Sequence, residues 1–386
     1  MMLETLKAIE RSSLDIGGFE PSPSPNLSSR LRARQKAAES FAGVETLQAT
    51  ASGAEERKHS LHLNVPCVVQ GSGAGFESVT RRWLTEDGRI NESYFRKHYG
   101  ELRVPLKPAS SSQLDEDGRA EDLPCITVTM LEWLETYRYH PDKHYLKDFH
   151  LLASLPSSSA SDLYSPPAFA RTDVLNPFLA AYDGGDYKFV YWGPLGSATG
   201  LHSDVANTFS WSYNVVGEKE WVFYNPSDES RQVRLTQRSG ELVFVPAGWK
   251  HTVRNVTETI SINHNWVHPA SIDLVWECVE VEVRAVEEEA KKWGLEMTVP
   301  EKERMLRGSC GLSVSMFFFM ALRACLESAR RISAAEEAEE RDDALYDYWC
   351  CREMLETLLG LDLVMERVRG CEGGDEYIEM AKGVLN

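Results

Sequence analysis

Short runs of aromatic and β-branched residues, separated by turn-forming residues, dominate the middle of the chain and constrain its fold more than any other feature. Residues 209–216 (FSWSYNVV) and 219–224 (KEWVFY) flank a Gly-Glu pair, and an Asn-Pro pair follows the second run. Aromatic and β-branched residues favour strands, whereas Gly, Asn and Pro favour turns. We therefore predict that residues 209–224 form a β-hairpin.

Two further runs continue this pattern. Residues 240–246 (GELVFVP) lead into a Pro-Ala-Gly turn, and residues 259–266 (TISINHNW) close the set. Short antiparallel strands with tight turns are typical of a sandwich or barrel. Inside such a core a polar side chain is costly unless it binds something, because it loses its water. Lys219, Asn263 and Asn265 are expected at such positions.

Two histidines and one aspartate in this segment have the spacing of a metal site. His202 and Asp204 are two residues apart, so on a strand both side chains point to the same face. His251, on a second strand, completes the set. Such a facial triad is typical of non-haem Fe(II), because it leaves positions free for a bidentate cosubstrate and O₂. The alternative is an ion pair of His202 with Asp204 and a structural His251.

Longer motifs surround these three residues and resemble one known family, the JmjC-type Fe(II)/2-oxoglutarate-dependent oxygenases. The family motifs are Gly193-Pro194, Thr199-Gly200-Leu201-His202-Ser203-Asp204, Gly217-x-Lys219-x-Trp221, Gly240-Glu241-x4-Pro246-x-Gly248-Trp249-x-His251 and Ile260-Ser261-Ile262-Asn263-His264-Asn265-Trp266. Within the family the chain is most similar to the jumonji domain-containing protein four group. That likeness rests on residues 64–67, 145–150, 187–191, 209–212, 260–267 and 307–311, and it covers most of residues 61–325.

The resemblance implies a fold and a metal. The fold is α+β with a mainly β core, a double-stranded β-helix barrel of the jelly-roll or cupin type, with N-terminal flanking elements and a C-terminal helical annex. The metal is Fe(II), bound by His202, Asp204 and His251, with 2-oxoglutarate as cosubstrate and O₂ as oxidant.

The resemblance also implies roles for polar residues near the metal. Lys219 matches the lysine that pairs with the distal carboxylate of 2-oxoglutarate, and an ammonium inside a barrel needs such an anion. Thr199 and Tyr145 match residues that contact the same carboxylate. One of Asn263 and Asn265 is expected near the cosubstrate, and the sequence does not distinguish between them.

Four aromatic residues near the motifs have less specific roles. His264 is expected on the opposite strand face from the site, and like His268 it is expected to be structural. Trp249 and Trp266 are expected to form walls of the site, where an aromatic ring can also cover the aliphatic stem of a substrate lysine.

The resemblance further implies hydroxylation of a lysine side chain in a protein, the eukaryotic peptide-chain release factor that recognises stop codons. The residues themselves indicate the oxygenase and not its substrate. Demethylation of N-methylated lysine or arginine is one alternative, disfavoured because the chain lacks recognisable chromatin-reading zinc modules. A non-catalytic binding protein is another, disfavoured because the triad is intact.

Composition excludes several classes of partner. The net charge of −18 argues against nucleic acids and anionic membranes, which need clustered Lys and Arg, and it permits a basic protein partner. No apolar run approaches the ~18 residues of a transmembrane helix. The first residues lack a basic stretch followed by an apolar one, and the eight cysteines show no CxxC spacing. We therefore expect a cytoplasmic protein, whose oligomeric state the sequence does not indicate.

The chain divides into segments of different composition. Residues 127–139 are expected to form a helix, and the aromatic run 316–322 is expected in a core or a dimer contact and not in a ligand site. We expect a flexible N-terminal arm with at most one short helix (1–60), an oxygenase domain (61–270) with inserts as surface loops (109–122 and 156–167), and a helical region (271–386).

Overall fold

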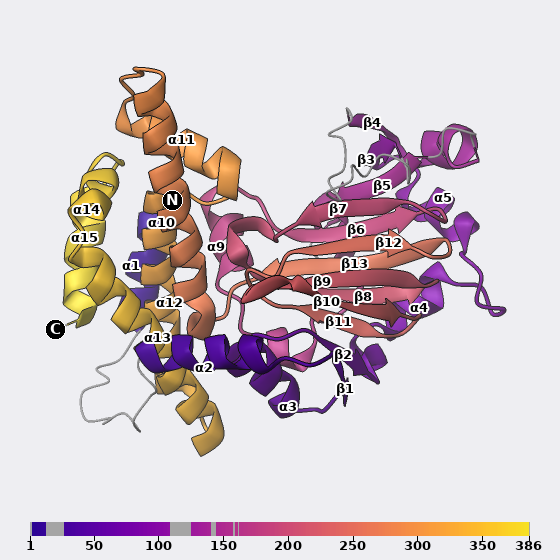
Figure 1. Ribbon diagram of the computed structural model, residues 1–386, viewed down its shortest axis with the longest axis horizontal. Coiled ribbons are helices and arrows are strands. Elements are labelled where there is room, and N and C mark those ends of the chain that lie inside the picture. Colours follow the sequence, from indigo (N-terminus) through magenta and orange to yellow (C-terminus); the bar gives the residue numbers. More distant parts are fainter. Residues whose placement is uncertain are drawn as a thin grey trace.

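The computed structural model describes residues 2–12, 27–108, 125–139, 144–156, 159–160 and 162–385. Its strands form two sheets, which lie on one side of the molecule, with a group of helices on the other (Figure 1). A large β core together with many helices places the protein in the α+β class, as predicted.

The larger sheet has nine strands in the order β1-β2-β11-β8-β13-β6-β5-β3-β4, and the smaller has four in the order β10-β9-β12-β7. The strands are β1 (Glu45–Gln48), β2 (Cys67–Gln70), β3 (Arg103–Pro108), β4 (Ile126–Thr129), β5 (His144–Phe149), β6 (Lys188–Gly193), β7 (Ala198–His202), β8 (Phe209–Val216), β9 (Lys219–Asn225), β10 (Asp228–Gln237), β11 (Leu242–Val245), β12 (His251–Asn255) and β13 (Thr259–Trp266).

The predicted hairpin of residues 209–224 is wrong, although both strands exist. β8 pairs with β11 and β13 in the larger sheet, whereas β9 pairs with β10 and β12 in the smaller one. The chain crosses between the sheets at Gly217, whose φ is +87°. A Cβ there would lie 2.1 Å from the carbonyl oxygen of Glu258, so only glycine fits this crossing.

Helices surround the sheets and form a separate group after β13. They are α1 (Met2–Ser12), α2 (Leu27–Ser40), α3 (Ala54–Arg57), α4 (Glu77–Trp83), α5 (Glu92–Tyr99), α6 (Met130–Glu132), α7 (Leu151–Ser154), α9 (Leu175–Tyr182), α10 (Ile272–Lys292), α11 (Val299–Cys310), α12 (Val314–Ala334), α13 (Ala338–Leu359), α14 (Asp362–Arg369) and α15 (Gly374–Leu385). Short 3-10 or π segments are η1 (Lys58–Leu63), η2 (Ser72–Gly75), η3 (Trp133–Tyr137), η4 (Ala168–Ala170), η5 (Val205–Asn207) and η6 (Pro269–Ser271).

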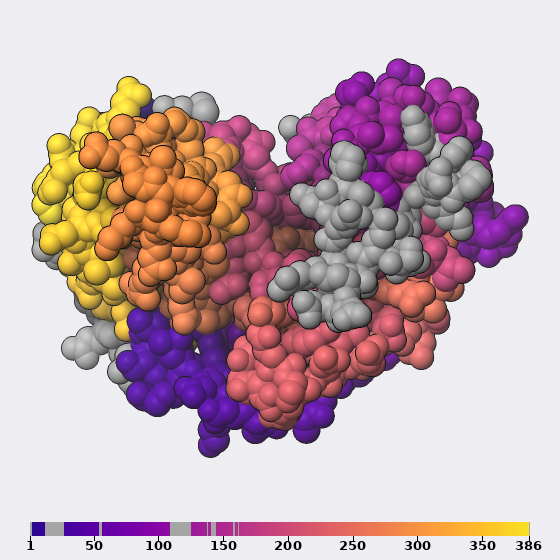
Figure 2. All heavy atoms as spheres, turned by 45° about the horizontal axis from the view of Figure 1, so that its top comes forward, coloured from indigo at the N-terminus to yellow at the C-terminus, as the bar shows by residue number. Residues whose placement is uncertain are grey.

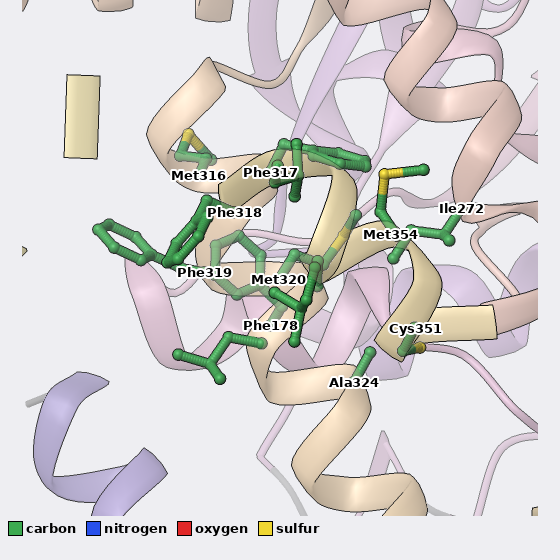
Figure 3. Packing of buried hydrophobic residues seen from close by; sticks show 14 of the residues in the cluster. Phe178, Ile272, Met316, Phe317, Phe318, Phe319, Met320, Ala324, Cys351 and Met354 are labelled. Atoms are coloured by element: carbon green, nitrogen blue, oxygen red, sulfur yellow. The ribbon is translucent and has the colours of Figure 1, made fainter. Parts of the chain in front are cut away.

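Helices α10 to α15 form what we call the helical region, and a hollow separates part of it from the strands on the face shown in Figure 2. The aromatic run on α12 lies in the core of this region, where Phe317, Phe318 and Phe319 are buried (Figure 3). No single described helix is long and apolar enough to cross a membrane. The α11–α12 pair passes that test by length and composition, but it is bent by 73° and α12 is mostly buried.

The expected flexible arm of residues 1–60 is wrong for its described part. Met2, Leu6 and Ile9 of α1 recur at helical spacing and pack into the core of the helical region. α2 is fixed by Arg34, which forms a buried ion pair of 2.6 Å with Asp273 of α10. β1 then pairs in parallel with β2. The segment is therefore packed between both halves of the molecule; residues 13–26 lie outside the described residues.

Two other local predictions need correction. Residues 127–139 are not one helix, because β4 pairs with β3 before the short helix α6 and the π-helical turn η3 begin. The insert 156–167 is more than a surface loop, since Leu163 is buried and the Tyr164 hydroxyl is 2.6 Å from His264 Nε2. The insert 109–122 lies outside the described residues.

Candidate active site

The eight residues predicted to bind the metal or the cosubstrate all line one cavity of about 230 Å³ between the two sheets. Each strand contributes through its alternation, because residues two apart on a strand face the same side. β7 carries Thr199, and β8 carries Ser210 and Ser212. The full set of predicted residues on the cavity wall is Tyr145, Thr199, His202, Asp204, Lys219, His251, Asn263 and Asn265.

The three candidate metal ligands lie together. Nitrogen and oxygen atoms of His202, Asp204 and His251 are all within 4.8 Å of one another. His202 and His251 are direct partners in the pairing of β7 with β12, and their rings are 4.3 Å apart. Asp204 follows β7 directly. The sheet register, and not a loop, thus brings the distant His251 to the other two residues.

The surroundings of these residues favour metal coordination over an ion pair. His202 Nδ1 lies 2.8 Å from the Gly200 carbonyl, and His251 Nδ1 lies 3.0 Å from the Trp249 carbonyl. When Nδ1–H donates to a carbonyl, Nε2 keeps its lone pair for a metal. Burial and the neighbouring His202 lower the pKa of His251 to about 4, so this imidazole is neutral at physiological pH.

Asp204 is oriented by a serine. Ser210 Oγ donates a 2.6 Å hydrogen bond to Asp204 Oδ2. Two imidazoles and a carboxylate on one side leave the rest of an octahedral coordination sphere to other ligands, which fits Fe(II). The residues present therefore fit the metal that the sequence predicts.

Lys219 is the most unusual charge in the cavity. It is 1% exposed, and burial lowers the pKa of its ammonium to about 7. Its Nζ donates a 2.5 Å hydrogen bond to Ser261 Oγ and lies 5.9 Å from the centre of the Tyr191 ring. No carboxylate of the described chain forms an ion pair with it. A buried cation that faces a cavity without an acidic partner fits an anionic ligand such as 2-oxoglutarate.

Thr199 and Tyr145 lie beside each other in the cavity wall. Tyr145 is buried, which raises the pKa of its phenol, and its hydroxyl shares hydrogen bonds with Thr199 and Asn255. Gly193 permits this packing, since a Cβ there would lie 2.3 Å from Asn255 Nδ2 and 2.8 Å from Tyr145. The two hydroxyls are thus adjacent, as a shared carboxylate contact requires.

The two asparagines differ in their hydrogen bonds. Asn265 Nδ2 donates a 3.1 Å hydrogen bond to Thr208 Oγ1. Asn263 Oδ1 is buried without a hydrogen-bond partner among the described residues. Asn263 therefore retains unused hydrogen-bonding capacity in the cavity, a difference that the alternating sequence pattern did not reveal.

The expected tryptophan walls are wrong. Neither tryptophan lines this cavity: Trp266 faces an apolar cluster on the other side of β13, and Trp249, on the turn before β12, is buried in a second apolar cluster and borders a larger, adjoining cavity. His264 also points away, toward Tyr164, as predicted. Trp221 takes the wall position instead, and its two-residue spacing from Lys219 was the signal that could have identified it.

Sequence reasoning missed two further parts of the wall. One is a row of rings on and beside β6, Tyr187, Phe189 and Tyr191, whose alternation could have been recognised. The other is Asp148 on β5, which no periodicity reveals because the strand is irregular there. Beyond Asp204 and Val205, which line both spaces, a larger cavity of about 1150 Å³ extends between α2, α10 and residues 226–231, which form the turn before β10 and the start of that strand.

Comparison with known proteins identifies relatives of this chain. A family model described as JmjC domain, hydroxylase matches residues 228–266, which include His251 but not His202 or Asp204. The chain is 29% identical over 324 residues to the human 2-oxoglutarate and iron-dependent oxygenase JMJD4, covering 73% of this chain and 74% of that protein. A Drosophila melanogaster JMJD4 homologue is 35% identical over 214 residues, 48% and 50% of the two chains. The Arabidopsis thaliana arginine-specific demethylase JMJ20 is 30% identical over 250 residues, 53% of each.

Proposed function

Because this chain belongs to the JmjC-domain Fe(II)- and 2-oxoglutarate-dependent oxygenases, we propose that it hydroxylates a lysine side chain of a protein substrate. The cofactors are Fe(II), 2-oxoglutarate and O₂. Bound together they supply the oxidant: one oxygen atom enters a C–H bond of the substrate and the other enters succinate, with release of CO₂.

The observation that carries this proposal is the meeting of two features in one cavity. His202, Asp204 and His251 offer a metal three ligands, and Lys219 offers a cation to the distal carboxylate of the cosubstrate. The protein's part is to bind, orient and exclude water, so no general base or nucleophile is required. The hydroxyls of Thr199 and Tyr145 complete the pocket for the cosubstrate.

The strand topology supports a finer assignment of the fold, the double-stranded β-helix. From β6 onward the chain alternates between the two sheets, except for the β9–β10 pair within the smaller sheet. Four strands of the larger sheet, β11, β8, β13 and β6, thereby face the four of the smaller one. Such a layout encloses a cavity between the sheets.

A protein substrate is what the sequence resemblance implies, and it is supported by the larger cavity that adjoins Asp204. We carry over from the sequence resemblance the eukaryotic peptide-chain release factor as this substrate and the cytoplasm as the place of reaction. Acidic residues around the larger cavity, such as Glu277 and Glu282, suit a basic polypeptide.

A second candidate is demethylation of an N-methylated arginine or lysine, which the likeness to a protein named as an arginine-specific demethylase favours. The same cofactors would then oxidise a methyl group, which leaves as formaldehyde. The two candidates differ only in which carbon is presented to the metal.

One assay separates the two. The purified protein is incubated with Fe(II), 2-oxoglutarate and release-factor peptides that contain lysine or its methylated forms, and succinate and peptide masses are followed. Hydroxylation adds the mass of one oxygen to the unmethylated peptide, whereas demethylation removes one methylene from the methylated one. Succinate without either change would contradict both assignments. The variant His202→Ala removes one of the candidate metal ligands. Its matched control is His98→Ala, which removes a histidine of α5 outside the cavity.

A further inference from the structure

Asp148 stands at an irregularity of the larger sheet beside the cavity. β5 and β6 pair at Leu146 with Trp192 and again at Phe149 with Val190, so β5 holds one extra residue between these pairs. Asp148 lies in this bulge with a φ of +60°, a conformation that residues other than glycine rarely adopt. Bulges beside a site redirect a side chain, and here the carboxylate lines the cavity.

The Asp148 carboxylate is held in place but is not neutralised. The Tyr191 hydroxyl donates a 2.7 Å hydrogen bond to Asp148 Oδ1. No cation of the described chain forms an ion pair with Asp148. The residue is half-buried, so a ligand in the cavity can reach it. An oriented carboxylate of this kind fits a cationic group that comes with the substrate.

An aromatic row leads along β6 toward this carboxylate. The rings of Tyr187 and Phe189 are 6.2 Å apart, those of Phe189 and Tyr191 are 6.1 Å apart, and all three line the cavity. Such a row covers methylene groups, and a carboxylate at its end accepts hydrogen bonds from an ammonium. The combination matches a long aliphatic side chain with a cation at its tip.

We propose that Asp148 binds the ammonium of the target lysine while the β6 aromatic row covers its methylene stem. The inference rests on the proposed function, because it names the subsite that the substrate occupies in the same cavity. Tyr191 is a positioning residue that orients the carboxylate. Lys219 and Asp148 then bind ligands of opposite charge. The cosubstrate dianion is attracted to Lys219, and the substrate cation is attracted to Asp148.

A binding experiment tests the subsite without turnover. The protein is loaded with Zn(II) and 2-oxoglutarate, and the affinities of n-butylammonium and of uncharged n-butanol are measured by NMR. Asp148→Asn keeps the size of the side chain and tolerates the left-handed conformation. We expect it to weaken butylammonium binding roughly tenfold to a hundredfold, the value of a hydrogen bond to a charged group. Butanol affinity should not change.

The matched control is Asp87→Asn, which removes the same charge from an exposed turn. It should bind butylammonium as the unmodified protein does. Equal butylammonium affinity in the unmodified protein and in Asp148→Asn would overturn the inference. Should Asp148→Asn fail to fold, Tyr191→Phe provides the test, because loss of its hydroxyl frees the carboxylate from its fixed orientation and should weaken butylammonium selectively.

A turnover experiment separates this inference from the proposed function. Peptides that differ only in lysine, norleucine or arginine at the target position are compared by kcat/KM. The unmodified protein should prefer lysine over norleucine, and Asp148→Asn should lose that preference. Lysine hydroxylation with an unchanged preference would overturn the inference and leave the proposed function. Selective butylammonium binding without hydroxylation of any lysine peptide would leave the inference and overturn the proposed function. A preference for arginine peptides would overturn the assignment to lysine.

Discussion

In strands β8 and β13, the side chains on one face stabilise the fold and those on the other face line the binding cavity. On the outer face most residues are aromatic or aliphatic and are buried in one apolar cluster: Phe209, Trp211, Tyr213, Val215, Ile260 and Ile262. On the inner face the alternate residues are polar and most line the cavity: Ser210, Ser212, Ser261, Asn263 and Asn265. One strand can therefore contribute to a core and to a site because its side chains alternate.

The inner face is expected to gain stability from its ligands, because several of its buried polar groups lack partners in the described part of the chain. Among the described residues, Lys219 has no anionic partner, and Asn263 Oδ1 and Ser212 Oγ have no hydrogen-bond partner, although all three groups are buried. Groups in this state cost free energy until a ligand satisfies them. Binding of cosubstrate should accordingly raise the thermal stability of the protein.

The largest expected effect comes from the metal ligands, at the rim of the inner face. His202→Ala or Asp204→Ala should abolish iron-dependent conversion of 2-oxoglutarate to succinate, because neither remaining pair fixes the metal. Thermal unfolding should stay near that of the unmodified protein, since the core lies on the outer face. Substantial succinate formation by either variant at limiting iron would refute the triad, with His98→Ala as the control.

Lys219→Ala should have the next largest effect, now on the cosubstrate alone. Removal of one member of a buried charge pair costs about 3–5 kcal/mol, which corresponds to roughly two or more decades in 2-oxoglutarate affinity. Iron binding without cosubstrate should stay nearly unchanged. Calorimetric titration measures both, with the exposed Lys292→Ala as the control. An unaltered cosubstrate affinity would place the anion elsewhere in the cavity.

On the outer face, Ile262→Ala should destabilise the fold by about 2–5 kcal/mol through a cavity in the core. The folded variant should still bind metal and cosubstrate, because the neighbouring Asn263 faces the other way. The paired change Ser261→Ala on the inner face should affect cosubstrate binding more than unfolding. Denaturant unfolding measures the stability and calorimetry measures the cosubstrate binding. A loss mainly of stability in both variants would contradict the proposed difference between the two faces.

The sequence predicted the site residues better than the path of the chain. His202 and Asp204 are local in sequence, and alternation assigns Lys219, Asn263 and Asn265 to one face, so their meeting in one cavity follows from simple strand geometry. The hairpin of residues 209–224 was wrong because alternation does not say which strands pair. The crossing at Gly217 depends on contacts with Glu258, far along the chain.

Other parts of the structure depend on long-range contacts that no local pattern contains. Composition made residues 1–60 seem flexible, but α1 is stabilised by α12, and α2 by the ion pair of Arg34 with Asp273. Asp148 was missed because alternation from Tyr145 assigns Lys147 to the cavity and Asp148 to the opposite face, whereas the bulge places Asp148 in the cavity as well. Trp249 and Trp266 were assigned to the wall by closeness in sequence, but Trp266 faces outward from β13 and Trp249 lies on the turn before β12.

Thr199→Ala tests a weaker cosubstrate contact on the inner side of the cavity. It should weaken 2-oxoglutarate binding by about 1–3 kcal/mol, the range for a hydrogen bond to a charged group. The effect should be smaller than that of Lys219→Ala, and Thr199→Ser, which keeps the hydroxyl, should restore most of the affinity. Equal losses in the alanine and serine variants would mean that Thr199 contributes by packing and not by its hydroxyl.

The smallest effect concerns pH and follows from the lowered pKa of Lys219, about 7 without its anion. The cosubstrate carboxylate pairs with the protonated amine, so binding takes up a proton once the pH exceeds that value. The dissociation constant should therefore rise about tenfold per pH unit above pH 7, until the pH reaches the pKa of the complex. The unfolded chain, in which the lysine keeps its ordinary pKa near 10.5, binds more protons over this range than the folded protein without cosubstrate. The stability of that form should accordingly rise with pH between about 7 and 10. Titrations of 2-oxoglutarate at several pH values in buffers of different ionisation enthalpy measure the proton uptake directly. The slope should vanish in Lys219→Ala, and a slope that persists there would assign the proton to another group of the inner face.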